Sequence, residues 1–144
     1  MNMIFKNVFF SLLLIIFLSL GTSLHAETGK RGDAKAVRLG KPIFQKHCSS
    51  CHGVNGEGEA AIPMAIRRDN YLTAPALNGT AHAWHHSDEN LMDTIMEGSP
   101  RTKRMTAWKH LFDKKTVTNV IAYIKNWWPD DLLACQGPKH MSCM

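Results

Sequence analysis

Apolar positions along much of this chain recur with the period of an α-helix. Val37, Gly40, Phe44 and Cys48 follow one another at steps of three or four, which predicts a helix with one buried face. The helical pattern starts at about Ala34, and Pro42 lies inside it. Because proline has no amide hydrogen and its ring clashes with the preceding turn, we expect the helix to begin near Gly40 or to kink there.

A second helix is predicted after Ser87, which can cap a helix N-terminus. Asp88 and Glu89 follow it, and acidic residues are favoured in a first helical turn. Gly98 and Pro100 are typical of a helix end. The buried face of this helix is predicted to consist of Leu91, Met92, Ile95 and Met96.

A third helix is predicted to start at Asp113 as its cap and to stop at Pro129. Its apolar face consists of Val117, Val120, Ile121, Ile124 and Trp128. Residues 59–71 indicate one or two helical turns, broken at Pro63. No segment shows the alternation of a β-strand, so the sequence predicts an all-α fold with three to four helices.

The N-terminal segment differs from the rest of the chain. Lys6 is the only charged residue before Glu27, and the stretch from Val8 to Leu20 is apolar except for two serines. A positive start followed by a short apolar stretch and a small residue is typical of a secretory signal peptide, which we predict for residues 1–26. The alternative is an uncleaved anchor, and we expect membrane contact only in that case.

Length and charge restrict the remaining possibilities. The chain has 144 residues and a net charge of +5, or +4 without Lys6, and the part after residue 26 suffices for one domain. Such a modest positive charge does not indicate a nucleic-acid-binding protein. It favours transient docking to an acidic protein surface.

One short motif points to specific chemistry. Cys48-Ser49-Ser50-Cys51-His52 matches C-x-x-C-H, the attachment signature of a c-type haem. Two thiols on one helical turn can each add to a vinyl group of the same porphyrin, and the next residue brings an imidazole to the iron. A zinc knuckle would need a second Cys/His pair, and a redox dithiol is the other alternative.

The chain resembles the class I, or monohaem, c-type cytochrome family. Gly40-x3-Phe44-x3-Cys48 reproduces the glycine and aromatic residue that precede the motif in that family, and Tyr123 stands where its last helix carries an aromatic residue. The resemblance covers residues 34–128. It implies a cytochrome c-like domain of three to four helices around one covalently attached haem, with His52 as the proximal iron ligand.

The resemblance also implies a ligand on the other side of the iron. Met105 lies between the second and third predicted helices, in a context similar to the ligand loop of the family, although Thr106 replaces a frequent proline. We predict Met105 as this ligand, since thioether sulfur favours ferrous iron. The alternatives are a histidine near Trp84, a methionine elsewhere or an open position. These histidines are His82, His85 and His86.

Two further groups are expected to support the haem. A ligating imidazole donates its second N–H to a nearby acceptor; in the resembling family this is a proline carbonyl, and Pro75 in Ala-Pro-Ala-Leu is our candidate. Pro63 stands at a more usual distance from the motif, so Pro75 requires an insertion within residues 57–72. Trp108 is a candidate donor to a haem propionate. Further candidates are Trp84, Arg101, Lys103 and Arg104.

The C-terminal tail, residues 129–144, contains Cys135 and Cys143. A disulfide between them is expected in an oxidising compartment. Free thiols and a copper-binding cluster with His140, Met141 and Met144 remain alternatives.

The function predicted from these features is that of an exported, periplasmic or respiratory one-electron carrier without a substrate pocket or catalysis of its own. A haem enzyme or gas-binding sensor with a labile distal ligand is one alternative, and a copper-handling accessory is another.

Overall fold

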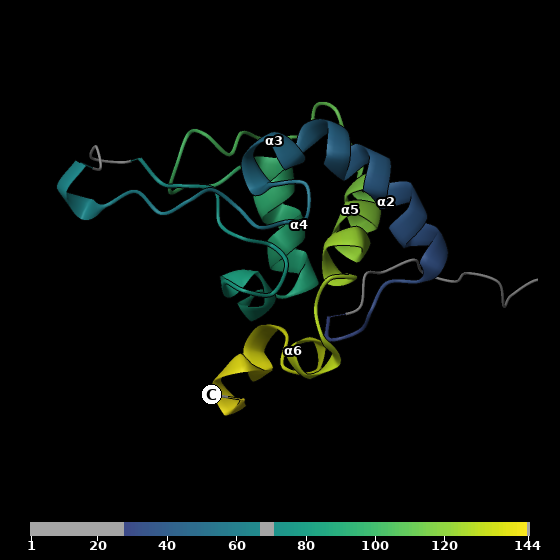
Figure 1. Cartoon of the computed structure of the whole chain (residues 1–144). Helices are drawn as coiled ribbons and strands as arrows, with labels where there is room; N and C mark the ends of the chain where they lie inside the picture. The colour runs from purple at the N-terminus through teal and green to yellow at the C-terminus, as the bar shows by residue number, and fades with distance from the viewer. Residues whose placement is uncertain (1–27, 67–70, 144) are drawn as a thin grey trace, which may run out of the picture.

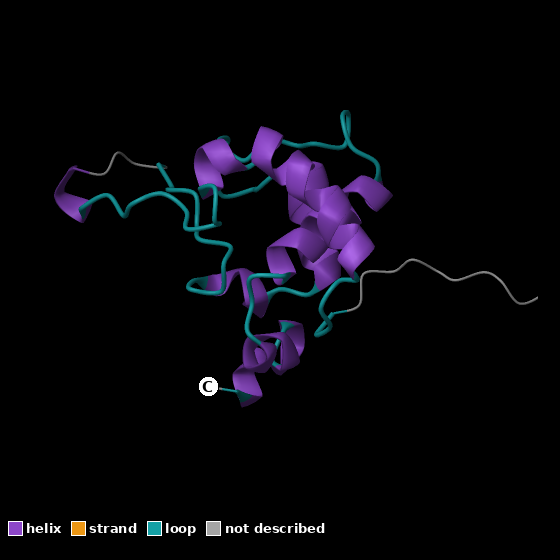
Figure 2. Ribbon diagram, turned by 45° about the vertical axis from the view of Figure 1, so that its right-hand side comes forward, coloured by secondary structure: helices purple, strands orange, loops and turns teal. Residues whose placement is uncertain are grey.

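The computed structural model of the protein describes residues 28–66 and 71–143 (Figure 1). The predicted signal peptide, residues 1–26, lies outside the described residues. The helices are α2 (Ala34–His47), α3 (Ser49–His52), α4 (Asp88–Glu97), α5 (Lys114–Lys125) and α6 (Asp130–Ala134), and the 3-10 helices are η1 (Met64–Ile66), η2 (His82–His85) and η3 (Gly137–Ser142). The described residues contain no β-strand (Figure 2), which confirms the all-α prediction. None of the described helices has the length and apolar character needed to cross a membrane.

The core forms where α2 crosses α5, and the two helices lie side by side in Figure 1. Phe44 of α2 is completely buried and packs against the rings of Tyr123 and Trp127, with ring centroids 5.5 and 5.1 Å apart. Gly40 lies at the closest approach: a Cβ added there would be 1.9 Å from the backbone oxygen of Asn119. Only a residue without a side chain permits this crossing.

Helix α2 begins at Ala34, where the helical pattern starts, and not near Gly40. Asp33 caps it by accepting hydrogen bonds from the backbone N–H groups of Lys35 and Ala36, both at 2.9 Å, and the helix continues through Pro42 to His47. Pro42 and Arg38 are both exposed. The carbonyl of Arg38, which loses its partner to the proline, therefore faces the solvent side of the helix.

Helix α5 ends at Lys125, three residues before the predicted end. Trp128 is nevertheless 1% exposed, because the chain turns after the helix and its indole Nε1 donates a hydrogen bond to the backbone oxygen of Leu77, at 2.6 Å. The side chain thus connects the end of α5 to the segment after Pro75. Its burial was predicted, but its place outside the helix was not.

A buried ion pair joins α4 to the end of α5. Lys125 Nζ lies 2.9 and 2.8 Å from the two carboxylate oxygens of Asp88, and both side chains are 2% exposed. Gln136 donates to the same carboxylate at 2.6 Å and to the backbone oxygen of His86 at 3.0 Å. Its side-chain oxygen accepts from the backbone N–H of Gly29 at 2.8 Å. These contacts hold both ends of the described chain against the helices.

The tail is structured rather than extended. After α6 it forms η3, which packs on η2, where the rings of His85 and His140 stack with centroids 4.6 Å apart. Cys135 and Cys143 form the expected disulfide.

We expect the double variant Cys135→Ser, Cys143→Ser to be less stable by up to about 2.5 kcal/mol, because the disulfide closes a loop of roughly nine residues and restricts the unfolded chain. Denaturant unfolding of the holoprotein, with and without a reductant, measures this. The reductant should lower the unfolding midpoint of the parent and leave that of the variant unchanged. An equal unfolding midpoint for the oxidised parent and the variant would contradict the expectation.

Candidate functional site

The Cys48–His52 motif lies on a single tight turn. Cys48 ends α2 and is followed directly by α3, so that the backbone N–H groups of Cys51 and His52 both bond to the oxygen of Cys48, at 3.2 and 2.9 Å. This turn brings both thiols and the imidazole to one wall of a cavity. Neither cysteine takes part in a disulfide.

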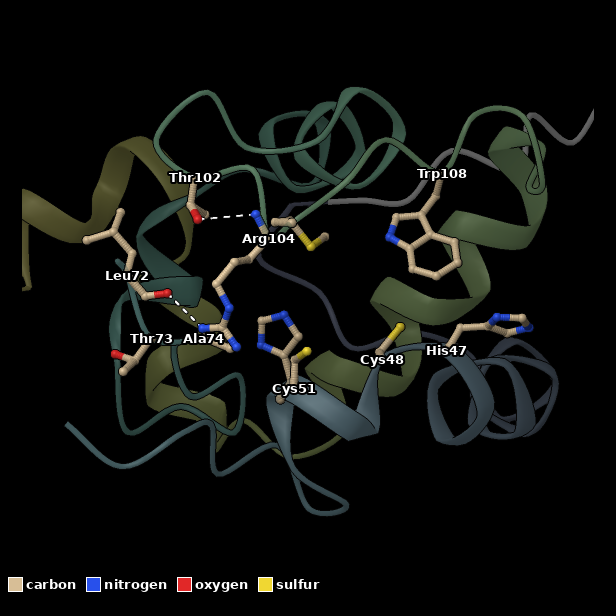
Figure 3. Close-up of a pocket in the computed structure, with 11 residues that line it drawn as sticks. His47, Cys48, Cys51, Leu72, Thr73, Ala74, Thr102, Arg104 and Trp108 are labelled. Carbon is tan, nitrogen blue, oxygen red and sulfur yellow. Dashed lines mark hydrogen bonds between the residues drawn. The ribbon is translucent and has the colours of Figure 1, made fainter. Parts of the chain in front are cut away.

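The cavity has an empty volume of about 540 Å³, including space open to solvent. Figure 3 shows Cys48 and Cys51 on one side, Trp108 and Thr102 on the opposite side, and residues 72–74 along a third. The lining residues are His47, Cys48, Cys51, His52, Leu72, Thr73, Ala74, Thr102, Arg104, Met105 and Trp108. The cavity therefore includes the motif, the predicted distal ligand Met105 and Trp108.

The backbone at Pro75 orients the imidazole of His52. His52 Nδ1 lies 2.9 Å from the backbone oxygen of Pro75, and since a carbonyl only accepts, the ring nitrogen donates. The backbone N–H groups of Leu77 and Asn78 bond to the oxygen of Gly56, at 2.7 and 3.1 Å. These bonds to Gly56 fix the Pro75 segment beside α3 despite the long loop between them. Because Nδ1 of His52 is engaged by Pro75, Nε2 is the nitrogen available to a metal.

Met105 is held by the C-terminal end of α4. The N–H of Ser99 bonds to the oxygen of Met105 at 3.0 Å, and the N–H of Trp108 bonds to the oxygen of Ile95 at 3.1 Å. Gly98, with φ +81, makes this approach possible, because a Cβ there would be 2.8 Å from the Met105 oxygen. Helix α4 thus fixes the loop that carries Met105 at the edge of the cavity.

The other predicted haem contacts have different surroundings. Trp108 stacks on Phe112, with centroids 5.4 Å apart, and meets the ring of His47 edge-on, so it forms an aromatic wall of the cavity. Arg101 and Lys103 are exposed. The candidate histidines His82, His85 and His86 belong to η2 or follow it, and none of them lines the cavity with the motif.

Arg104 is already occupied by protein groups. Its guanidinium donates to Glu59 Oε2 at 2.6 Å and to the backbone oxygen of Leu72 at 3.0 Å, and it lies 4.5 Å from the centroid of the Tyr71 ring. This ion pair, together with a hydrogen bond from the N–H of Ala74, lowers the pKa of the Glu59 carboxyl to about 2.

Burial changes the protonation of the motif. It raises the pKa of the Cys48 thiol to about 11, with a smaller contribution from Cys51, and it lowers the pKa of His52. A redox dithiol attacks through a thiolate with a lowered pKa, and the buried Cys48 thiol is not of that kind. A neutral imidazole is the form that binds a metal.

The residues of the cavity fit a haem. Ligand cavities of this kind enclose roughly 300–1,000 Å³ with mostly apolar walls. This one has two cysteine sulfurs three residues apart that are in no disulfide, an imidazole whose Nδ1 donates to a carbonyl beside them, and a thioether in the same lining. No group of three or more His, Cys, Asp or Glu side chains is arranged for a metal ion among residues 28–66 and 71–143.

The fold and this site define a class I c-type cytochrome, which carries covalently bound haem c. The sequence profile described as "Cytochrome C oxidase, cbb3-type, subunit III" matches residues 35–124. The chain belongs to this family.

Two curated relatives are described as "Cbb3-type cytochrome c oxidase subunit CcoP". The one from Azospirillum brasilense is 31% identical over 94 residues, which are 65% of this chain and 29% of the relative. The one from Azospirillum sp. (strain B510) is 28% identical over 98 residues, which are 68% of this chain and 31% of the relative. The chain therefore spans less than a third of the length of these relatives.

A solved structure, cytochrome cL of the marine methylotrophic bacterium Methylophaga aminisulfidivorans, matches with a TM-score of 0.54 and 22% identity. The match covers 84% of this chain and 72% of that one. This likeness shows the fold.

Sequence reasoning missed Glu59, Tyr71 and Leu72. Glu59 lies seven residues after the motif and 45 residues before Arg104, its ionic partner. No local pattern joins positions so far apart. The one available signal was the predicted insertion within residues 57–72, because the two ends of an inserted loop need contacts that hold them to the rest of the domain.

Proposed function

We propose that the protein is an exported one-electron carrier in which His52 and Met105 are the two axial ligands of the haem iron. When bound, haem c supplies an iron that changes between the ferric and ferrous states. The observation that supports the proposal best is the common cavity: Met105, from the loop after α4, lines the same hollow as the Cys48–His52 motif. With both axial positions filled by protein, no position remains for a substrate.

In this proposal each residue of the site has a distinct role. Cys48 and Cys51 would hold the porphyrin through two thioethers, and their place on one turn fixes its orientation. The backbone oxygen of Pro75 accepts a hydrogen bond from His52 Nδ1–H, which directs Nε2 to the metal. The Met105 thioether raises the reduction potential relative to a second histidine, and Trp108 excludes water from its side of the cavity.

We further propose that partners are redox proteins that dock transiently through an acidic surface. The curated relatives are named as oxidase subunits, which supports a place in a respiratory chain. Arg101 and Lys103 are exposed next to the cavity-lining residues Thr102 and Arg104. Such charges accelerate encounter more than they tighten binding, and electron-transfer contacts are small. The predicted signal peptide supports a periplasmic location.

Replacement of Met105 by alanine tests the proposal. We expect the parent holoprotein to be low-spin in both oxidation states, with the weak near-infrared band of a ferric Met–iron bond and negligible binding of carbon monoxide. The Met105→Ala variant should lose this band, bind carbon monoxide rapidly when ferrous and have a lower potential. Met96→Ala, on α4 and outside the cavity lining, is the matched control.

The same measurement tests the alternatives. If the parent binds carbon monoxide as fast as Met105→Ala does, the proposed role as an electron carrier is contradicted, and a gas-binding sensor or haem enzyme is favoured. The copper-handling alternative relied on Cys135 and Cys143 as thiolate ligands, and their disulfide removes the thiolates that it requires.

A further inference from the structure

The long loop between the motif and Pro75 is closed at its base by contacts to a single side chain. Glu59, at the start of the loop, and Tyr71 and Leu72, at its end, all contact the guanidinium of Arg104. The two ends also bond to each other. The N–H of Glu59 donates to the oxygen of Ala74 at 2.9 Å, and the N–H of Ala74 donates to Glu59 Oε2 at 2.8 Å.

This arrangement is partly shielded from solvent. The side chains of Arg104 and Glu59 are 33% and 27% exposed, and both nitrogens of the guanidinium fork engage the two oxygens of the carboxylate. A two-bond pair of this kind is directional as well as attractive. It holds Arg104 in one orientation against residues 71–74, as Figure 3 shows for the bond to Leu72.

Arg104 directly precedes Met105, and the following residues give little rigidity of their own. Thr106 and Ala107 leave φ free, whereas a proline would fix it. On the α4 side the loop is held through backbone bonds at Ser99 and Trp108. On the opposite side, Arg104 makes the described contacts between this loop and residues 71–74. The orientation of Met105 therefore depends on what holds Arg104.

We propose that Glu59 is a positioning residue for the distal side of the haem: by binding Arg104 it holds the chain before Met105 against residues 71–74 and keeps the thioether directed into the cavity. The long loop then serves the redox site, because its two ends form the anchor. The proposal rests on the function proposed above, in which Met105 is the distal ligand.

The test uses the holoprotein with Glu59→Gln, which preserves size and an acceptor for the N–H of Ala74 but removes the charge that binds Arg104. Each protein is examined for the Met–iron band and for the rate of carbon monoxide binding to the ferrous form. We expect Glu59→Gln to weaken the band and to increase the rate about tenfold, the size of effect associated with losing one charge-assisted bond. Arg104→Gln should have the same effect, and the double variant should add little to either.

Glu97→Gln is the matched control, because it removes the carboxylate of a different ion pair, with Lys109, at the α4 end of the loop that carries Met105. It should leave both readouts at the parent values. Unfolding of each variant by denaturant shows whether a change at the iron arises from general loss of structure. Equal carbon monoxide rates in the parent and in Glu59→Gln would overturn the role of Glu59 while leaving the carrier intact. A parent without the Met–iron band would instead overturn the proposed function on which this role rests.

Discussion

Replacing Lys125 by methionine is expected to destabilise the protein by about 3–5 kcal/mol, which is typical for the loss of one partner of a buried ion pair. The substitution preserves most of the side-chain length but leaves the carboxylate of Asp88 without its charged partner. That carboxylate is 2% exposed, so water cannot replace the ammonium group. Gln136, which bonds to the same oxygen, compensates for little of the charge. Denaturant unfolding of the holoprotein measures the change.

Lys109→Met is the control for this prediction, since it removes the exposed pair between Lys109 and Glu97, and exposed pairs contribute about 1 kcal/mol or less. The double variant Lys125→Met, Asp88→Leu should regain much of the lost stability, because it leaves no isolated charge. If Lys125→Met and Lys109→Met unfolded at the same denaturant concentration, the ion pair would not have the importance that its burial implies.

Gly40→Ala is expected to destabilise the protein by about 3 kcal/mol or more, at the upper end of the usual cost of overfilling a tightly packed position. In an ordinary helix the same change stabilises by up to about 1 kcal/mol. The sign is reversed here because the new methyl group would lie 1.9 Å from the oxygen and 2.5 Å from the carbonyl carbon of Asn119. Both are backbone atoms, so only a separation of α2 from α5 relieves the contact.

Lys41→Ala, at the adjacent exposed position of α2, should change stability by no more than about 0.5 kcal/mol. Thermal unfolding of the two variants and the parent makes the comparison. A Gly40→Ala protein as stable as the parent would show that the helices cross at a greater distance than the structure indicates.

The helices were predictable because their signals are local. Asp33, Ser87 and Asp113 each accept hydrogen bonds from the N–H groups of the helix that follows, and two of these caps were recognised in advance. The start of α2 was left open between about Ala34 and Gly40, since the sequence does not reveal that Pro42 lies on the exposed face of the helix. The end of α5 was placed at Trp128, because burial was taken as evidence that the residue is helical.

The sequence alone determined the chemistry and the class of fold. Cys48, Cys51 and His52 are close in the chain, and their spacing specifies a haem attachment turn whatever surrounds it; the helical period likewise specifies an all-α chain. The tertiary structure alone decided which distant residues surround and support that turn. The ion pair of Glu59 with Arg104 and the buried pair of Asp88 with Lys125 join residues 45 and 37 positions apart. The contact of Pro75 with His52 spans 23 positions and was expected only from the resemblance to a known family. Contacts over such distances depend on how loops close, which no local pattern records.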